Sequence, residues 1–231
     1  MQIVALDPDR PEQDFPDLDM ALRDPNGLLA IGGCLSRTRL LNAYRQGIFP
    51  WYNPDEPILW WSPNPRLVLL PNQLIISRSL KKTLRRNTFV VTFDKAFQEV
   101  ITACANLREE STGTWITEDI NQAYTDLHKA GYAHSVETWL NGQLVGGLYG
   151  VAIGQVFFGE SMFHRATDAS KVAFVHLVEH LKQWEYQLID CQVHTSHLSS
   201  LGATNCSRNE FKNLLNKYCE RPANPSAWLS T

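Results

Sequence analysis

One segment, SVETWLNGQLVGGLYGVAIGQVFF (residues 135–158), gives the clearest view of the chain's architecture. Its apolar and β-branched residues predict strands at Ser135–Leu140 and Leu144–Ile153, with a third beginning at Gln155–Phe158. Between the first two stand Asn141 and Gly142, a pair typical of tight hairpins because both residues accept positive φ angles. The segment therefore predicts antiparallel strand pairing.

Regular elements are predicted on either side of this segment. Further strands are expected at Leu67–Leu70, Phe89–Phe93 and Leu188–Val193. Helices are expected to begin at Ser77, Phe97, Thr117, Asp168 or Ser170, and Glu210, and to end near Arg86, Cys104, Ala130, Trp184 and Tyr218. Thr117 is expected to cap its helix, with two acids in the first turn.

Residues 1–66 differ in composition from the rest. They hold nine of the twelve prolines and three of the seven tryptophans. Since proline fixes φ and removes a backbone donor, loops and short elements packed by aromatic rings are expected, with one helix capped by Ser36 and stopped by Gly47. The predicted class is α+β: a small N-terminal domain, residues 1–65, and a larger domain with a mixed, largely antiparallel sheet, residues 66–231.

The bulk properties exclude several classes of protein. With 44% hydrophobic residues the chain is not disordered, and a net charge of −3 argues against a basic nucleic-acid coat. No apolar run is long enough to span a membrane, and residues 1–10 lack a signal-peptide core. The five cysteines are odd in number and form no CxxC motif, so a soluble, cytoplasmic protein is expected.

A basic run occupies residues 78–86, where five of nine residues are cationic and no acid intervenes. These cations are Arg78, Lys81, Lys82, Arg85 and Arg86. Most of them share one helical face, where like charges repel. One interpretation is a solvated face, and the other, which the uninterrupted run favours, is a phosphate-binding surface.

Glu160 stands among aromatic residues, just before a polar turn and a helix. A carboxylate there needs a partner or a cationic ligand, and the helix N-terminus could bind an anion. The alternative is a structural Glu160 paired with Arg165.

Residues 188–194 hold three polar side chains at alternating positions. Asp190, Gln192 and His194 would share one face of a strand and line a polar cleft, unless each is satisfied separately by the backbone. Cys191 would face the core, so a hydrolytic triad is disfavoured. His176 and His180 alone are a weak zinc signal, and no metal is expected.

Taken together, ten strings make the chain similar to one family over nearly its full length. They are PNGLLAIGG (25–33), GIFPW (47–51), ILWWSPNPR (58–66), ISRS (76–79), GTWIT (113–117), VGGLYG (145–150), GESMF (159–163), ASK (169–171), LIDCQV (188–193) and SLGA (200–203). The chain resembles the bacterial leucyl/phenylalanyl-tRNA–protein transferases. That resemblance implies a C-terminal domain like the GNAT-type N-acetyltransferases, a monomer, and no cofactor.

The resemblance also implies an activity. Such enzymes move Leu, or less well Phe or Met, from aminoacyl-tRNA to the N-terminal Arg or Lys of a protein, which marks it for degradation. The implied catalytic residues are Asp190, Gln192 and Glu160. The proton of the acceptor amine could leave through Gln192 or through the terminal hydroxyl of the tRNA.

The resemblance further implies three groups of binding residues. The aminoacyl pocket would be lined by Leu148, Phe157, Gly159, Leu177, Leu181 and Ile189. Aromatic residues near the tRNA 3′ end and the pocket would be Tyr44, Trp51, Trp115 and Tyr124. The tRNA backbone would lie on the five cations of residues 78–86.

Two alternative functions would each require different features of the sequence. A CoA-dependent acyltransferase would need a glycine-rich loop before the helix at 169–184, but residues 165–170 contain no glycine and Asp168 would repel pyrophosphate. A non-catalytic tRNA-binding module would keep the basic run without needing the three polar site residues.

Overall fold

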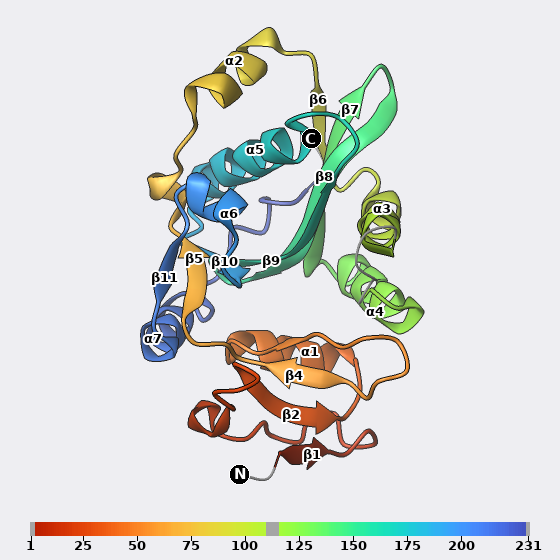
Figure 1. Cartoon of the computed structure of the whole chain (residues 1–231), viewed down its shortest axis with the longest axis vertical. Coiled ribbons are helices and arrows are strands. Elements are labelled where there is room, and N and C mark those ends of the chain that lie inside the picture. Colours follow the sequence, from red (N-terminus) through yellow and green to blue (C-terminus); the bar gives the residue numbers. More distant parts are fainter. Residues whose placement is uncertain (1–2, 110–115, 230–231) are drawn as a thin grey trace.

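The computed structural model describes residues 3–109 and 116–229, which form two β-sheets and their helices (Figure 1). The smaller sheet has the order β1-β2-β4-β3. Its strands are β1 (Val4–Leu6), β2 (Leu28–Gly32), β4 (Leu59–Trp61) and β3 (Phe49–Pro50). Helix α1 (Arg37–Arg45) begins at the expected cap, where Ser36 accepts the backbone N–H of Arg39. The expectation of loops and short elements missed this sheet.

The larger sheet has seven strands in the order β11-β5-β10-β9-β8-β7-β6. They are β11 (Thr204–Cys206), β5 (Arg66–Leu69), β10 (Leu188–Gln192), β9 (Val156–His164), β8 (Gln143–Ile153), β7 (Ala133–Leu140) and β6 (Val90–Phe93). Neighbours pair antiparallel except β9 and β10, which pair in parallel. The predicted α+β class with a mixed, largely antiparallel sheet is confirmed, and Asn141 and Gly142 form the predicted hairpin turn at φ 51° and 76°.

The remaining helices follow the expected order. They are α2 (Arg78–Arg86), α3 (Phe97–Glu109), α4 (Glu118–Lys129), α5 (Ala169–Gln183), α6 (Ser196–Ser200) and α7 (Arg208–Tyr218), with 3-10 turns at Leu18–Met20 and Pro71–Gln73. Thr117 caps α4 through its side chain, as predicted, and Ser77, where a helix was expected to begin, caps α2 in the same way. Asp168 occupies the cap position of α5, but its side chain makes no capping hydrogen bond. Helix α6 and strand β11 were not predicted.

The helices cover both faces of the larger sheet. Helix α5 packs on one face, whereas α3 and α4 pack on the other (Figure 1). The core beneath α3 and α4 continues into the smaller sheet, since Tyr44 and Trp60 belong to the same buried cluster as Tyr124 and Phe158. The expected boundary after residue 65 falls between β4 and β5. It stays a prediction, because the two sheets share this core.

Strands β9 and β10 separate along their length. Their register joins Val156–Phe158 to Leu188–Asp190, after which β9 continues beside β8 alone. The ladder between β8 and β9 has a bulge at Glu160, and β10 ends where Gln192 adopts φ 60°. Such irregularities re-aim side chains and end pairing, so a gap opens in the sheet between these strands.

Candidate active site

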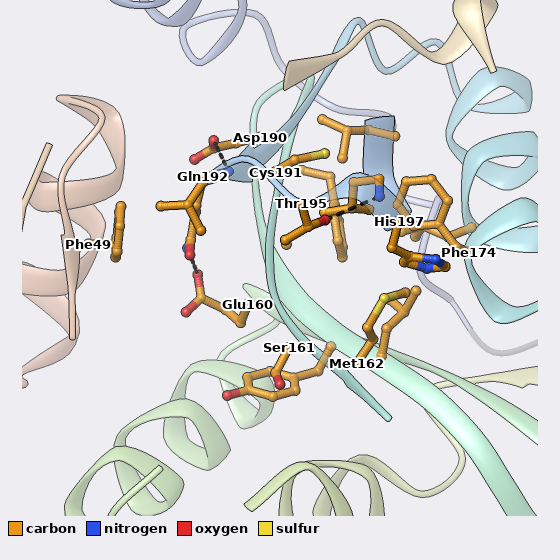
Figure 2. A pocket seen from close by; sticks show the side chains of 18 of the residues that line it. Phe49, Glu160, Ser161, Met162, Phe174, Asp190, Cys191, Gln192, Thr195 and His197 are labelled. Atoms are coloured by element: carbon orange, nitrogen blue, oxygen red, sulfur yellow. Dashed lines mark hydrogen bonds between the residues drawn. The ribbon is translucent and has the colours of Figure 1, made fainter. Parts of the chain in front are cut away.

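A cavity of about 340 Å³ lies where β9 and β10 separate (Figure 2). Both sheets contribute to it: Phe49, Pro50 and Trp51 come from the smaller sheet and its edge, and the rest from β8, β9, β10, α5 and the α6 region. One end carries Glu160 and Gln192, which point toward each other, while Met162, Phe174 and His197 lie at the other end (Figure 2). The cavity is therefore polar at one end and mainly apolar at the other.

A buried arginine, Arg66, holds Asp190 in place. It was not among the residues predicted for the site. Arg66 donates through Nε and Nη2 to the two carboxylate oxygens of Asp190, at 2.8 and 2.7 Å. Both side chains are buried, and Arg66 also donates to the carbonyl oxygen of Gly47 at 3.1 Å. The guanidinium lies 4.8 Å from the ring of Phe49 and 4.7 Å from that of Phe211. A bidentate pair between aromatic rings fixes the orientation of Asp190.

Asp190 in turn fixes the backbone of Gln192. Its Oδ1 accepts the Gln192 backbone N–H at 2.9 Å, which holds the left-handed conformation at that residue. The Gln192 side-chain Nε2 then donates to Glu160 Oε1 at 2.9 Å. Among residues 3–109 and 116–229, no donor is hydrogen-bonded to the amide oxygen of Gln192, which is left as an acceptor. Asp190 therefore positions Gln192 through the main chain.

Glu160 lies at the base of the polar end and is only 8% exposed. Tyr124 donates to its Oε2 at 2.9 Å, and the hydroxyl of Tyr124 is itself hydrogen-bonded to that of Tyr44. Burial raises the pKa of Glu160 to about 7, although hydrogen bonds from the two tyrosines oppose this rise. The alternative pairing with Arg165 is wrong, because the Arg165 guanidinium lies over the ring of Phe163.

Burial limits what two of the predicted aromatic residues can contact. Tyr44 and Tyr124 are 0% exposed, so neither can stack on a nucleic-acid base. They support Glu160 instead. Trp51 is 46% exposed at the edge of the cavity, 5.8 Å from the ring of Trp61, and its face is open to a ligand. Trp115 lies outside the described residues.

The apolar end contains most of the residues expected for an aminoacyl pocket. Leu148, Phe157, Gly159, Leu177 and Ile189 line the cavity. Leu181 does not: it lies one helical turn beyond Leu177, in the core. Phe174, one turn before Leu177, lines the cavity and was not among the residues expected there. Helical spacing was the available signal for Phe174, since it shares one face of α5 with Leu177 and Leu181.

The strand-like alternation of side chains expected for residues 188–194 does not continue beyond residue 190. Because Gln192 ends the strand, His194 lies in an exposed loop, not beside Asp190. Cys191 belongs to the core as predicted and also reaches the cavity wall. Burial raises the pKa of its thiol well above the ordinary value, which disfavours a thiolate nucleophile.

Two further polar atoms in the cavity wall lack hydrogen-bond partners among the described residues: Ser161 Oγ and His197 Nε2. Burial, and to a lesser extent the nearby Lys171, lower the pKa of His197. Apart from their residue types, nothing in the sequence marked Ser161 or His197 as a candidate site residue.

The basic run forms an exposed surface on α2. Four of its cations, Arg78, Lys81, Lys82 and Arg85, line one shallow hollow, and Arg86 is also exposed. Within residues 3–109 and 116–229, none of the five is ion-paired with a carboxylate. Thr83 on the same helix donates to Asp168 Oδ2 at 3.0 Å, which ties α2 to the start of α5.

The start of α5 carries a negative charge of its own. Asp168 accepts from Lys171 at 3.0 Å, and this contact lowers the pKa of the carboxyl group. An anion at this helix N-terminus would meet that carboxylate. In the described parts of the chain, no group of three or more His, Cys, Asp or Glu side chains is arranged to hold a metal ion. No helix among these residues is long and apolar enough to cross a membrane.

Two family models match the chain. Residues 68–216 match "Leucyl/phenylalanyl-tRNA protein transferase" and residues 33–64 match the N-terminal domain of the same family. A leucyl/phenylalanyl-tRNA–protein transferase of Methylococcus capsulatus is 58% identical, covering 98% of this chain and 96% of its own. One of Nitrosomonas europaea is 59% identical, covering 93% and 91%.

These matches define an aminoacyltransferase. The chain belongs to the leucyl/phenylalanyl-tRNA–protein transferase family.

Similar solved structures are much more distant. A GCN5-related N-acetyltransferase from Kribbella flavida is 11% identical with a TM-score of 0.39, covering 70% of this chain and 57% of its own. A conserved protein of unknown function from Staphylococcus epidermidis is 9% identical with a TM-score of 0.46, covering 87% and 86%. Likenesses of this size do not identify a function, and the acetyltransferase-like character of the larger domain stays a prediction.

The buried ion pair gives a stability prediction. We expect Arg66→Leu to lower the free energy of unfolding by about 3–5 kcal/mol, because it leaves Asp190 buried without its cation. The double variant Arg66→Leu/Asp190→Leu should recover much of this loss, since it buries no lone charge. Denaturant unfolding measures both.

Lys171→Ala is the matched control, because it breaks a partly exposed pair with Asp168 and should cost less than about 1 kcal/mol. A double variant that is as unstable as Arg66→Leu would contradict the account of the pair.

Proposed function

We propose that this chain transfers Leu, or less well Phe or Met, from aminoacyl-tRNA to the N-terminal Arg or Lys of a protein and so creates a degradation signal. The names of its relatives support transfer from tRNA to protein. The observation that carries the finer proposal is one cavity in which the Glu160–Gln192 pair adjoins an apolar end. We further propose that the enzyme acts in the cytoplasm as a monomer.

The donor would place its side chain in the apolar end. Leu148, Phe157, Leu177 and Ile189 offer a surface suited to Leu. The terminal adenosine would lie toward the mouth, where the exposed face of Trp51 can stack on a base, an interaction worth about 1–3 kcal/mol. The cations of α2 would hold the tRNA backbone without reading its sequence.

The reaction joins the acceptor α-nitrogen to the carbonyl carbon of the aminoacyl ester and breaks the bond from that carbon to the tRNA oxygen. The acceptor amine must first lose a proton. With a pKa of about 7, Glu160 can take that proton from an α-ammonium group, whose pKa is about 8. The amide oxygen of Gln192 would accept an N–H of the same amine and orient its lone pair.

On going from an ammonium group to an amide the nitrogen loses two protons: Glu160 would take the first and release it to solvent, and the second would reach the tRNA oxygen released from the ester. Asp190 would be a positioning residue, because it contacts the Gln192 backbone and Arg66. Because an ester is activated relative to an amide, the transfer needs no ATP and no cofactor. The CoA-dependent alternative is disfavoured by the carboxylate of Asp168 at the start of α5.

The proposal is tested by a transfer assay with Leu-tRNA, the purified protein and a peptide beginning with Arg, without ATP or CoA. Labelled Leu should appear on this peptide and on one beginning with Lys, but not on an N-acetylated copy. No transfer to either free peptide would overturn the proposal, and transfer of an acetyl group from acetyl-CoA would favour the alternative.

A pH profile tests the role of Glu160. The carboxylate accepts a proton only when ionised, so the turnover number should rise with pH through a midpoint near 7. Glu160→Gln should lower turnover by about 10²–10⁴-fold and abolish this acid limb. Glu179→Gln, on the exposed face of α5, is the control. If the limb persists in Glu160→Gln, another group takes the proton.

The basic surface predicts a salt dependence. We expect Lys82→Ala/Arg85→Ala to weaken tRNA binding and to reduce the slope of log affinity against log salt by about one for each charge removed. Filter binding at several salt concentrations measures the slope. Lys212→Ala, an exposed cation on α7, should leave it unchanged; equal losses in both proteins would contradict a specific surface on α2.

A further inference from the structure

The segment that follows α7 runs back toward α5 and the end of β6 (Figure 1). There Trp228 joins an aromatic cluster that includes Phe93 of β6. Trp228 is the centre of this cluster. Its ring stacks on His134 at 4.0 Å and 11°, and on Phe157 at 5.9 Å and 27°. His180 lies 4.9 Å away. Nothing in the proposed reaction uses this tryptophan, yet it touches a residue of the cavity wall.

Phe157 transmits that contact to the cavity. Its side chain is 1% exposed and lines the apolar end. On β8, Gly150 leaves space for the ring, because a Cβ atom there would lie 2.6 Å from both Cε1 and Cζ of Phe157. The ring is thus packed against the backbone at Gly150 and against the indole of Trp228. It has no room to shift while both are in place.

Trp228 is itself held firmly. Its Nε1 donates to the hydroxyl of Tyr186 at 2.8 Å, and the ring of His134 beneath it is fixed by Asp94 at 2.7 Å. The tail is anchored where it leaves α7, since the backbone N–H of Gln155 donates to the carbonyl oxygen of Tyr218 at 2.9 Å. The indole therefore acts as a fixed support behind the wall of the cavity.

We infer that Trp228 is a specificity-determining positioning residue: through Phe157 it limits the length of the donor side chain that the pocket admits. The inference rests on the proposed function. Without the indole, the Phe157 ring can move back into the vacated space and the apolar end lengthens. Phe would then fit better, and Leu would lose contacts with the wall.

The test compares donors on one tRNA, charged in turn with Leu and with Phe. For Trp228→Ala, the ratio of kcat/KM for Phe to kcat/KM for Leu should rise about tenfold, the scale expected when a pocket changes by one or two methylene groups. This ratio does not depend on the fraction of folded enzyme, because both donors meet the same preparation. A general loss of stability would lower both values equally.

Two variants control the comparison. Trp184→Ala removes a tryptophan whose ring contact is with His180, and it should leave the ratio unchanged. Trp228→Phe keeps an aromatic ring against Phe157 and should stay within about twofold of the native ratio. If Trp228→Ala does not fold, Trp228→Leu gives the same measurement with less loss of packing.

A ratio that stays constant in Trp228→Ala or Trp228→Leu, or that rises equally in Trp184→Ala, would overturn the inference. With either outcome, the proposed function is still supported if the native enzyme transfers Leu. Native enzyme that transfers neither Leu nor Phe would overturn the function and this inference together.

Discussion

The buried ion pair between Arg66 and Asp190 is the interaction on which the candidate site depends. Arg66 opens β5 directly after the smaller sheet, and Asp190 lies on the neighbouring β10. The same guanidinium donates to Gly47 near the smaller sheet. One side chain thus joins both sheets to the carboxylate that fixes Gln192. A charge pair removed from water is stabilising only when its hydrogen bonds are satisfied, and here both Asp190 oxygens are.

The site also depends on a failure of regular pairing. Strands β9 and β10 are joined at one end only, and the gap between them becomes the cavity. The bulge at Glu160 and the left-handed Gln192 bring two side chains together across that gap. Burial then adjusts the proton affinity of Glu160, while the neighbouring apolar wall remains continuous. A regular sheet would have closed the gap with backbone hydrogen bonds.

Local signals predicted much of this fold. Ser36 and Thr117 were recognised as helix caps because a cap acts within three residues, and Asn141–Gly142 was recognised because a hairpin turn is equally local. The smaller sheet was not predicted, because its strands have only two to five residues and lie in a proline-rich part of the chain. Interactions between residues far apart in the sequence were not predicted either. Arg66 and Asp190 are 124 residues apart, and no local pattern links them.

Within the site, too, local patterns predicted some residues and not others. Asp190, Gln192 and Glu160 were singled out through their polar character in apolar strands and through a family resemblance. The strand period then placed His194 beside them, which the turn at Gln192 prevents. Tyr44 and Tyr124 were expected near the site from the family resemblance alone, and only the packing of α1 against α4 shows that they are buried supports of Glu160.

The sequence distance between Arg66 and Asp190 has a consequence for synthesis of the chain on the ribosome. The smaller sheet and β5 emerge early, with Arg66 still lacking its carboxylate. The cation stays unpaired until more than half of the protein has been made, and β10 must then insert between β5 and β9. Contacts of such high sequence separation fold slowly. Nascent chains that stop short of residue 190 therefore carry an incomplete sheet and no working site.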